Sequence, residues 1–194
     1  MPPLILASGS PRRRELLEEA GFEFVVKATS VDETLTAQEL EKPDEAAQKL
    51  AKRKAQGVAN ENRTCVVLGS DTIVAIQRET GFQILGKPEN RADSKRMIQL
   101  LSGKSHSVYT SVALFINGEE FCEVDKTTVI FRELTSSEID AYVATGEGDD
   151  KAGAYAIQGL GVDLVDHFEG DIQTVVGLPI SLVKKGLNSL GYRC

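Results

Sequence analysis

LILASGSPRRRELL, residues 4–17, places an apolar run, a short Ser-Gly-Ser segment and three consecutive arginines within one stretch. Residues 4–7 show no alternation of apolar and polar side chains, which is typical of a strand covered on both faces. Ser10 stands at the expected N-cap of a helix, Pro11 at its first position, and Gly21 at its end. The stretch therefore predicts a strand, a tight loop and a helix.

Strand and helix patterns continue along the chain. Apolar runs predict strands over residues 22–27 and 65–76, within 81–90, and over 105–116, 121–131 and 162–168. Helical spacing predicts helices over residues 44–60, 91–101, 136–145 and 178–190. The third of these helices would be capped by Ser136 or Ser137, and Asn117-Gly118 is a strong hairpin signal. The polar segment 28–43 lies between elements, and the glycine-rich segment 146–161 is expected to be a functional loop.

These patterns indicate an α/β fold in which helices flank a mixed, twisted sheet and two lobes enclose a cleft. We expect a single domain over residues 1–194, because a chain of this length buries about 70% of its unfolded surface. No stretch approaches the roughly 18 apolar residues of a membrane span, and the N-terminal apolar run is too short for a secretion signal. We therefore expect a soluble, cytoplasmic protein with no membrane partner.

Charge and metal-ligand composition argue against other classes of function. The chain has 29 acidic and 22 basic side chains and a formal net charge of −7, whereas broad nucleic-acid binding needs a distributed cationic surface. An anionic ligand would need a local pocket. The three cysteines (65, 122 and 194) and two histidines (106 and 167) have no spacing that suits zinc or an iron–sulfur cluster. We expect Cys65, Cys122, His106 and His167 to be packing residues.

The arginines at the helix start are the clearest candidate binding site. The start of a helix has unpaired N–H groups and a partial positive charge, so it attracts phosphate. Hydroxyls of Ser8 and Ser10 and the guanidinium groups of Arg12 and Arg13 add donors at the same point, whereas Arg14 is expected to face solvent. The pattern predicts a polyphosphate site of a kind other than the Walker A loop. The alternative is a first turn whose arginines lie in water.

Five more residues are candidates, each with a structural alternative. Asp71 is expected at the carboxyl end of a strand, as a metal ligand, as a base for water, or merely as a turn residue. Glu33 is either a second acid of the site or a solvated loop residue. Lys54, on the apolar face of a helix, either snorkels or reaches a buried anion. Lys87 lies on a stiff turn, where its ammonium either contacts a phosphate or stays in solvent. Gln158 either hydrogen-bonds the edge of a nucleotide base or binds the backbone of its own loop.

Seven motifs resemble those of the Maf family in order and spacing. They are LASGSPRR at 6–13, VDET at 31–34, KRKA at 52–55, GSDTIV at 69–74, GKP at 86–88, KAGAYAIQG at 151–159 and VVGLP at 175–179. The resemblance covers essentially the whole chain, and the first, fourth and sixth motifs together are very specific. Maf proteins are nucleoside triphosphate pyrophosphatases, once described as septum-formation inhibitors.

This resemblance implies a fold related to that of the inosine triphosphate pyrophosphatases and a homodimer. It also implies hydrolysis of a nucleoside triphosphate to monophosphate and pyrophosphate with Mg²⁺ or Mn²⁺. Asp71 is then the general base, Glu33 its metal or water partner, and both are metal ligands. The phosphate-binding residues that the resemblance implies are Ser8, Arg12, Arg13, Lys54 and Lys87.

Three positions resemble the branch of the family that acts on dTTP and UTP, namely Arg13, Thr72 and Gln158. The implied role is house-cleaning of nucleotide pools, with the 7-methyl-GTP activity of the sister branch as the alternative. Two departures from the family pattern, Gly148 in place of proline and Ala156 in place of glycine, lie in the segment that affects base preference.

A non-enzymatic nucleotide-binding regulator of cell division is the alternative from another class. Glu33 and Asp71 argue against it, because carboxylates beside a polyphosphate repel it unless a metal lies between them.

Overall fold

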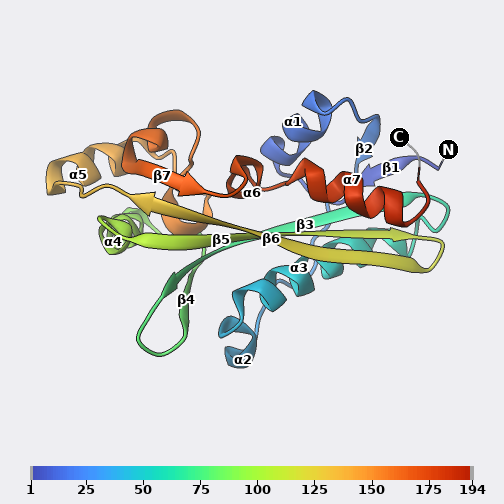
Figure 1. Ribbon diagram of the computed structural model, residues 1–194, viewed down its shortest axis with the longest axis horizontal. Helices are drawn as coiled ribbons and strands as arrows, with labels where there is room; N and C mark the ends of the chain where they lie inside the picture. The colour runs from blue at the N-terminus through green and yellow to red at the C-terminus, as the bar shows by residue number, and fades with distance from the viewer. Residues whose placement is uncertain (1, 193–194) are drawn as a thin grey trace.

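A computed structural model describes residues 2–192 as a seven-stranded mixed sheet with helices on both faces (Figure 1), which confirms the predicted fold class. The strand order is β2-β1-β3-β5-β6-β7, with β4 also paired to β3. The strands are β1 (Leu4–Leu6), β2 (Phe24–Val26), β3 (Val66–Gln77), β4 (Phe82–Leu85), β5 (Ser105–Ile116), β6 (Glu119–Phe131) and β7 (Val165–Glu169). Cys194 lies outside the described residues.

The helices form layers on the two faces of the sheet. Figure 1 shows α1, α6 and α7 on one side of the long strands and α3 on the other. The α-helices are α1 (Pro11–Glu19), α2 (Ala37–Leu40), α3 (Pro43–Ala59), α4 (Arg91–Leu101), α5 (Ser136–Thr145), α6 (Ile172–Val176) and α7 (Ile180–Ser189). Two 3₁₀ helices, η1 (Ala152–Ala154) and η2 (Gly159–Leu164), lie in the glycine-rich segment. None of the helices within residues 2–192 is long and apolar enough to cross a membrane.

β1 confirms the prediction of a strand covered on both faces. Leu4 and Leu6 pack into the large apolar cluster beneath α1 and α7, while Ile5 packs with the alanines of α3 on the opposite face. All three side chains are at most 2% exposed. Cys65 and Cys122 are partly buried against the α3 cluster, in agreement with their predicted packing role.

Several predicted bounds are confirmed and others are corrected. α4, α5 and β5 have the predicted bounds, and the turn at Asn117-Gly118 has positive φ at both residues (50° and 87°), as a type I′ hairpin requires. The cap of α5 is Thr135, whose side chain accepts from the Glu138 N–H, so the prediction of Ser136 or Ser137 is wrong. The short helices α2 and α6 were not predicted, since four or five residues are too few to show helical periodicity. β7 starts three residues later than predicted because η2 occupies residues 159–164.

The edge of β3 that faces β1 and β4 is interrupted. β1 pairs with residues 66–68 and β4 with residues 74–77, so residues 69–73 have no neighbour on this edge among the described strands. On the other edge, β5 pairs continuously with residues 67–75. Successive side chains of a strand point to opposite faces. Asp71 and Thr72 therefore meet the same gap from opposite faces of the sheet.

The two histidines have different environments. His106 is a packing residue of β5, as predicted: it is 2% exposed, its Nε2 lies 2.7 Å from the Tyr155 hydroxyl, and its ring packs edge-on against Phe131 and Tyr155. Burial lowers the pKa of His106 to about 4. His167 is exposed on the edge strand β7 with its Nδ1 2.7 Å from an Asp166 oxygen, so its predicted packing role is wrong.

Acid is expected to destabilise the fold through His106. The imidazole protonates near pH 6.5 in the unfolded chain but only near pH 4 in the folded one. The neutral, buried side chain therefore contributes its full share to the free energy of unfolding above pH 6.5, and this share is lost as the pH falls toward 4. Between pH 7.5 and 4.5 this loss is on the order of 2 to 3 kcal/mol. Urea unfolding at both pH values should show a correspondingly smaller loss for His106→Gln, which still offers Tyr155 a partner but does not titrate. Equal losses in the two proteins would contradict the assignment.

Candidate active site

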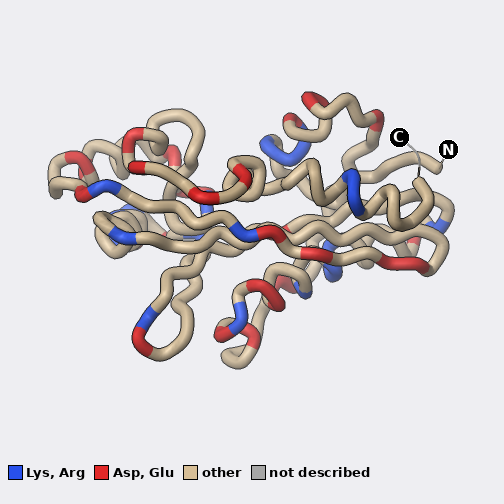
Figure 2. Tube along the Cα trace, viewed as in Figure 1, with Lys and Arg blue, Asp and Glu red and all other residues tan. Residues whose placement is uncertain are grey.

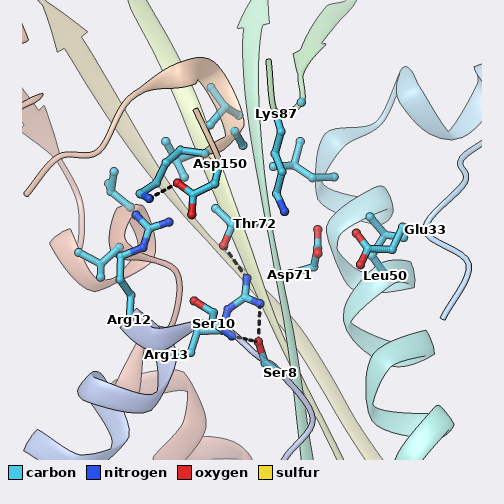
Figure 3. A pocket seen from close by; sticks show the side chains of 18 of the residues that line it. Ser8, Ser10, Arg12, Arg13, Glu33, Leu50, Asp71, Thr72, Lys87 and Asp150 are labelled. Atoms are coloured by element: carbon cyan, nitrogen blue, oxygen red, sulfur yellow. Dashed lines mark hydrogen bonds and ion pairs between the residues drawn. The ribbon is translucent and has the colours of Figure 1, made fainter. Parts of the chain in front are cut away.

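A cleft of about 850 Å³ opens at the interrupted edge of β3 (Figure 3). Its walls are the β1–α1 loop, α3 with the loop that precedes it, the middle of β3 with β4, and the 150–157 segment with α6. Elements far apart in the sequence thus meet where β3 lacks a neighbouring strand. This is the cleft that the sequence predicted.

The cleft is cationic although the chain is acidic. The charged side chains that line it are Arg12, Arg13, Glu33, Lys54, Asp71, Lys87, Asp150 and Lys151. These five cations and three carboxylates leave a net charge of +2, against −7 for the whole chain. Over the rest of the fold, Lys and Arg positions are interspersed with Asp and Glu positions (Figure 2). An anion is therefore attracted to the cleft more than to the surface around it.

Arg13 connects three segments of the cleft. Its Nε donates to the Gly177 carbonyl (2.9 Å), Nη1 to Ser8 Oγ (3.2 Å) and Nη2 to Thr72 Oγ1 (3.2 Å). Burial lowers the pKa of Arg13, and the nearby Asp71 carboxylate opposes this shift. All three hydrogen-bond acceptors are uncharged. A cation so held keeps its charge available to an anionic ligand.

Arg12 and Arg14, which flank Arg13 at the start of α1, make different contacts. Arg12 lines the cleft beside Asp150 (Figure 3), and burial lowers its pKa while that carboxylate opposes the shift. Arg14 is exposed, with its Nε 2.7 Å from Glu18 one turn further along the helix. The prediction that Arg14 faces solvent is confirmed. Only Arg12 and Arg13 line the cleft among the three.

Lys54 reaches into the cleft from α3 and contacts both predicted acids. Its Nζ lies 2.5 Å from Asp71 Oδ1 and 3.1 Å from Glu33 Oε1, and its side chain is 13% exposed. It thus reaches a buried carboxylate rather than snorkelling. α3 can approach β3 closely because Gly69 has no side chain: a Cβ at this position would lie 2.4 Å from the Ala51 carbonyl oxygen.

Asp71 lies in the middle of β3, not at the end of a strand, which corrects the prediction. The polar run does not end the strand because its side chains are bound within the fold. Ser70 donates to the Gly177 carbonyl (3.1 Å), Thr72 shares a hydrogen bond with Thr110 (3.0 Å), and Asp71 pairs with Lys54. Each polar side chain of residues 70–72 therefore has a partner, as burial requires.

Burial raises the pKa of Asp71, whereas Lys54 and Arg13 act to lower it. The residue is 7% exposed and also lies near Glu33, which adds to the rise. A buried carboxylate with a raised pKa in a cleft is typical of a group that accepts a proton during a reaction.

The loop that carries Glu33 is fixed by a residue that the sequence analysis missed. Arg53 Nη1 donates to the carbonyls of Asp32 (3.1 Å) and Thr34 (2.8 Å), which flank Glu33 on either side. The KRKA motif places Arg53 beside Lys54 but gives no sign of its backbone partners. Arg53 and Lys54 together hold this acid at the rim of the cleft, where its side chain is 58% exposed.

The other predicted residues differ in how they meet the cleft. Ser8 is buried, and its Oγ also accepts from the backbone N–H of Ser10 (3.2 Å), which lines the cleft without making a side-chain cap. Lys87 lines the cleft from the turn after β4. Gln158 precedes η2, is exposed, and is absent from the residues that line the cleft, so its role in reading a base stays a prediction.

Asp71 and Glu33, the two acids expected to hold a metal, both contact Lys54 in the cleft. Within residues 2–192, no cluster of three or more His, Cys, Asp or Glu side chains is arranged to hold a metal. Mg²⁺ is commonly held by one or two carboxylates together with the phosphates of a substrate. Two carboxylates that share the Lys54 ammonium fit that mode, in which a polyphosphate supplies the remaining oxygens.

A family model described as Maf-like protein matches residues 3–190. The chain belongs to this family. The match includes every residue that lines the cleft, so the Maf motifs and the geometry concern the same site.

Curated relatives are similar over nearly the whole chain. Proteins named dTTP/UTP pyrophosphatase from Bacillus anthracis, Bacillus thuringiensis subsp. konkukian and Bacillus cereus are each 49% identical over 187 residues, which cover 96% of this chain and 95% of the relative. A solved structure, a nucleoside-triphosphatase / dITP/XTP pyrophosphatase from Mycobacterium abscessus, aligns over 97% of both chains with 13% identity and a TM-score of 0.47.

The two departures from the Maf motifs lie where the glycine-rich segment folds on itself. A Cβ at Gly148 would lie 1.9 Å from the Ala154 carbonyl oxygen, so the loop as it stands has no room for the proline of the family pattern. A Cβ at Gly161 would lie 1.8 Å from the carbonyl oxygen of Ala156. The family proline at position 148 would therefore require a different loop path, whereas glycine at position 156 would only remove a methyl group.

Proposed function

We propose that the protein hydrolyses nucleoside triphosphates to the monophosphate and pyrophosphate, with dTTP and UTP as its substrates. The observation that carries the proposal is the cationic cleft in which Lys54 holds the buried acid Asp71. Membership of the Maf family and 49% identity to relatives named dTTP/UTP pyrophosphatase support the substrate choice. Arg13 and Thr72, two of the positions that resemble the dTTP/UTP branch, are hydrogen-bonded to each other in the cleft.

The reaction is attack of water on the α-phosphorus with pyrophosphate as the leaving group. Arg12, Arg13 and Lys87 bind the triphosphate and stabilise the negative charge that develops on its oxygens. Asp71 orients the attacking water and accepts its proton, and Lys54 fixes the carboxylate for this task. Fixed donors in a partly buried cleft need little rearrangement as charge develops, which is the main source of catalysis in phosphoryl transfer.

We further propose Mg²⁺ or Mn²⁺ as cofactor, held by Asp71 and Glu33 together with phosphate oxygens. When bound, such an ion supplies positive charge to the phosphates and lowers the pKa of a coordinated water. A bound metal ion would also account for the two acids, Asp71 and Glu33, in a cleft that attracts anions, because without the cation their carboxylates would repel the phosphates of the substrate.

The test is a panel of dTTP, UTP, CTP, ATP, GTP and 7-methyl-GTP, with Mg²⁺ or with EDTA, in which pyrophosphate is resolved from orthophosphate. We expect pyrophosphate chiefly from dTTP and UTP, and none with EDTA. Faster release from 7-methyl-GTP would favour the sister activity. Saturable binding without turnover of any nucleotide would favour a non-enzymatic regulator of cell division.

On the family resemblance we also propose a single domain that works as a homodimer in the cytoplasm. Light scattering tests the homodimer directly, because a homodimer has twice the 21.0 kDa mass of the chain.

A further inference from the structure

A chain of hydrogen bonds leads from Arg13 into the core behind the cleft. Arg13 Nη2 lies 3.2 Å from Thr72 Oγ1, Thr72 Oγ1 lies 3.0 Å from Thr110 Oγ1, and Thr110 Oγ1 lies 2.6 Å from the carbonyl oxygen of Thr174. Thr72 and Thr110 are direct partners in the antiparallel register of β3 and β5, so their side chains share one face of the sheet. Thr110 and Thr174 are fully buried, and Thr72 lines the cleft.

The chemistry of the two ends fixes the direction of every proton in this chain. A carbonyl oxygen only accepts, so Thr110 must donate its single hydroxyl proton to Thr174. Thr110 is then an acceptor toward Thr72, which must donate its own proton to Thr110. A guanidinium only donates, so the remaining bond runs from Arg13 to the Thr72 oxygen. The three bonds are mutually consistent and leave no proton to spare.

The Thr72 hydroxyl therefore offers a ligand only one kind of hydrogen bond. Its hydroxyl oxygen has one proton and two lone pairs. The proton is committed to Thr110 and one lone pair to Arg13, so the group presents only a lone pair to the cleft. A hydroxyl is ordinarily both donor and acceptor toward a ligand, whereas this one can act toward a ligand only as an acceptor.

We propose that Thr110 is a positioning residue that sets the base preference of the cleft by holding the Thr72 hydroxyl in its acceptor state. The group that this state recognises is a ring N–H donor, such as the imide N–H of uracil and thymine. The corresponding ring nitrogen of cytosine is an acceptor, and two lone pairs facing each other leave both groups unpaired. A site built to bind a donor rejects a ligand that lacks one because the buried groups then lose their hydrogen bonds. The inference rests on the proposed function, since it concerns pyrimidine triphosphates in the same cleft.

The test compares Thr110→Val with Thr110→Ser, using kcat/KM for UTP and CTP in the full chain. Valine has the shape of threonine without the hydroxyl, so Thr72 becomes free to donate as well as accept. We expect the UTP to CTP ratio of kcat/KM to fall about tenfold in Thr110→Val and to be restored in Thr110→Ser, which keeps the hydroxyl. Should the valine variant not fold, Thr110→Ala removes the same hydroxyl with a smaller side chain, and the ratio remains the readout.

The outcomes separate this inference from the proposed function. An equal fall of kcat/KM for both nucleotides would show a merely structural role and overturn the inference. An unchanged ratio in the valine and alanine variants would overturn it as well. Failure of the wild-type protein to release pyrophosphate from UTP would instead overturn the proposed function.

Discussion

Asp71→Asn is expected to lower kcat for dTTP about 1000-fold. The amide has the shape of the carboxylate but can neither accept a proton at neutral pH nor neutralise Lys54, which lies 2.5 Å away. General-base catalysis alone contributes about 10²- to 10⁴-fold, so a loss of this size follows from that role. A steady-state assay of pyrophosphate release at saturating Mg²⁺ measures it.

The matched control is Asp163→Asn, which makes the same chemical change at an exposed residue of η2 outside the cleft. We expect its kcat to stay within twofold of wild type. Near-full turnover by Asp71→Asn at a Mg²⁺ concentration that just saturates the wild-type protein would exclude Asp71 both as base and as metal ligand. Recovery of activity only at high Mg²⁺ would indicate that metal binding, rather than proton transfer, is the lost function.

Local sequence patterns predicted the parts of the site that depend on neighbouring residues. The strand, tight loop and helix of residues 4–17 follow from an apolar run, a capping position and a proline within one stretch, and Arg12 and Arg13 enter the cleft from the predicted helix start. The helical spacing around Lys54 placed it on the apolar face of α3, from which it could reach only an edge or a buried anion. In each case a few adjacent residues carry the information.

The features that depend on distant pairings were not predicted. Asp71 lies within a strand because β5 pairs with residues 67–75 of β3, and its edge is open because β1 and β4 pair with opposite ends of the same strand. The Gly177 carbonyl that receives Arg13 is 164 positions away along the chain. No periodicity or motif spacing encodes which of several carbonyls lies opposite a given guanidinium, so these contacts appear only in the fold.

Arg13→Lys is expected to lower kcat/KM for dTTP about 100- to 1000-fold although the charge is retained. A lysine ammonium is a compact point charge, so it cannot replace the planar guanidinium that reaches Gly177, Ser8 and Thr72 at once. Two of these partners, Ser8 and Gly177, belong to separate loops, which lose a shared donor when the guanidinium is removed. The expected loss corresponds to about 3 to 4 kcal/mol, comparable with the removal of one or two buried hydrogen bonds to a charged group.

Arg14→Lys, one residue further along, provides the control that separates charge from geometry. Arg14 carries the same charge on the same helical turn but points to solvent and contacts Glu18, and exposed ion pairs contribute little to stability. We expect unchanged kcat/KM in this variant, measured with the same assay. If both variants were equally active, the general positive potential of the helix start would suffice for binding. If only Arg13→Lys fails, Arg13 and Arg14 are distinct in function, and activity needs the guanidinium that contacts Gly177, Ser8 and Thr72 rather than a positive charge alone.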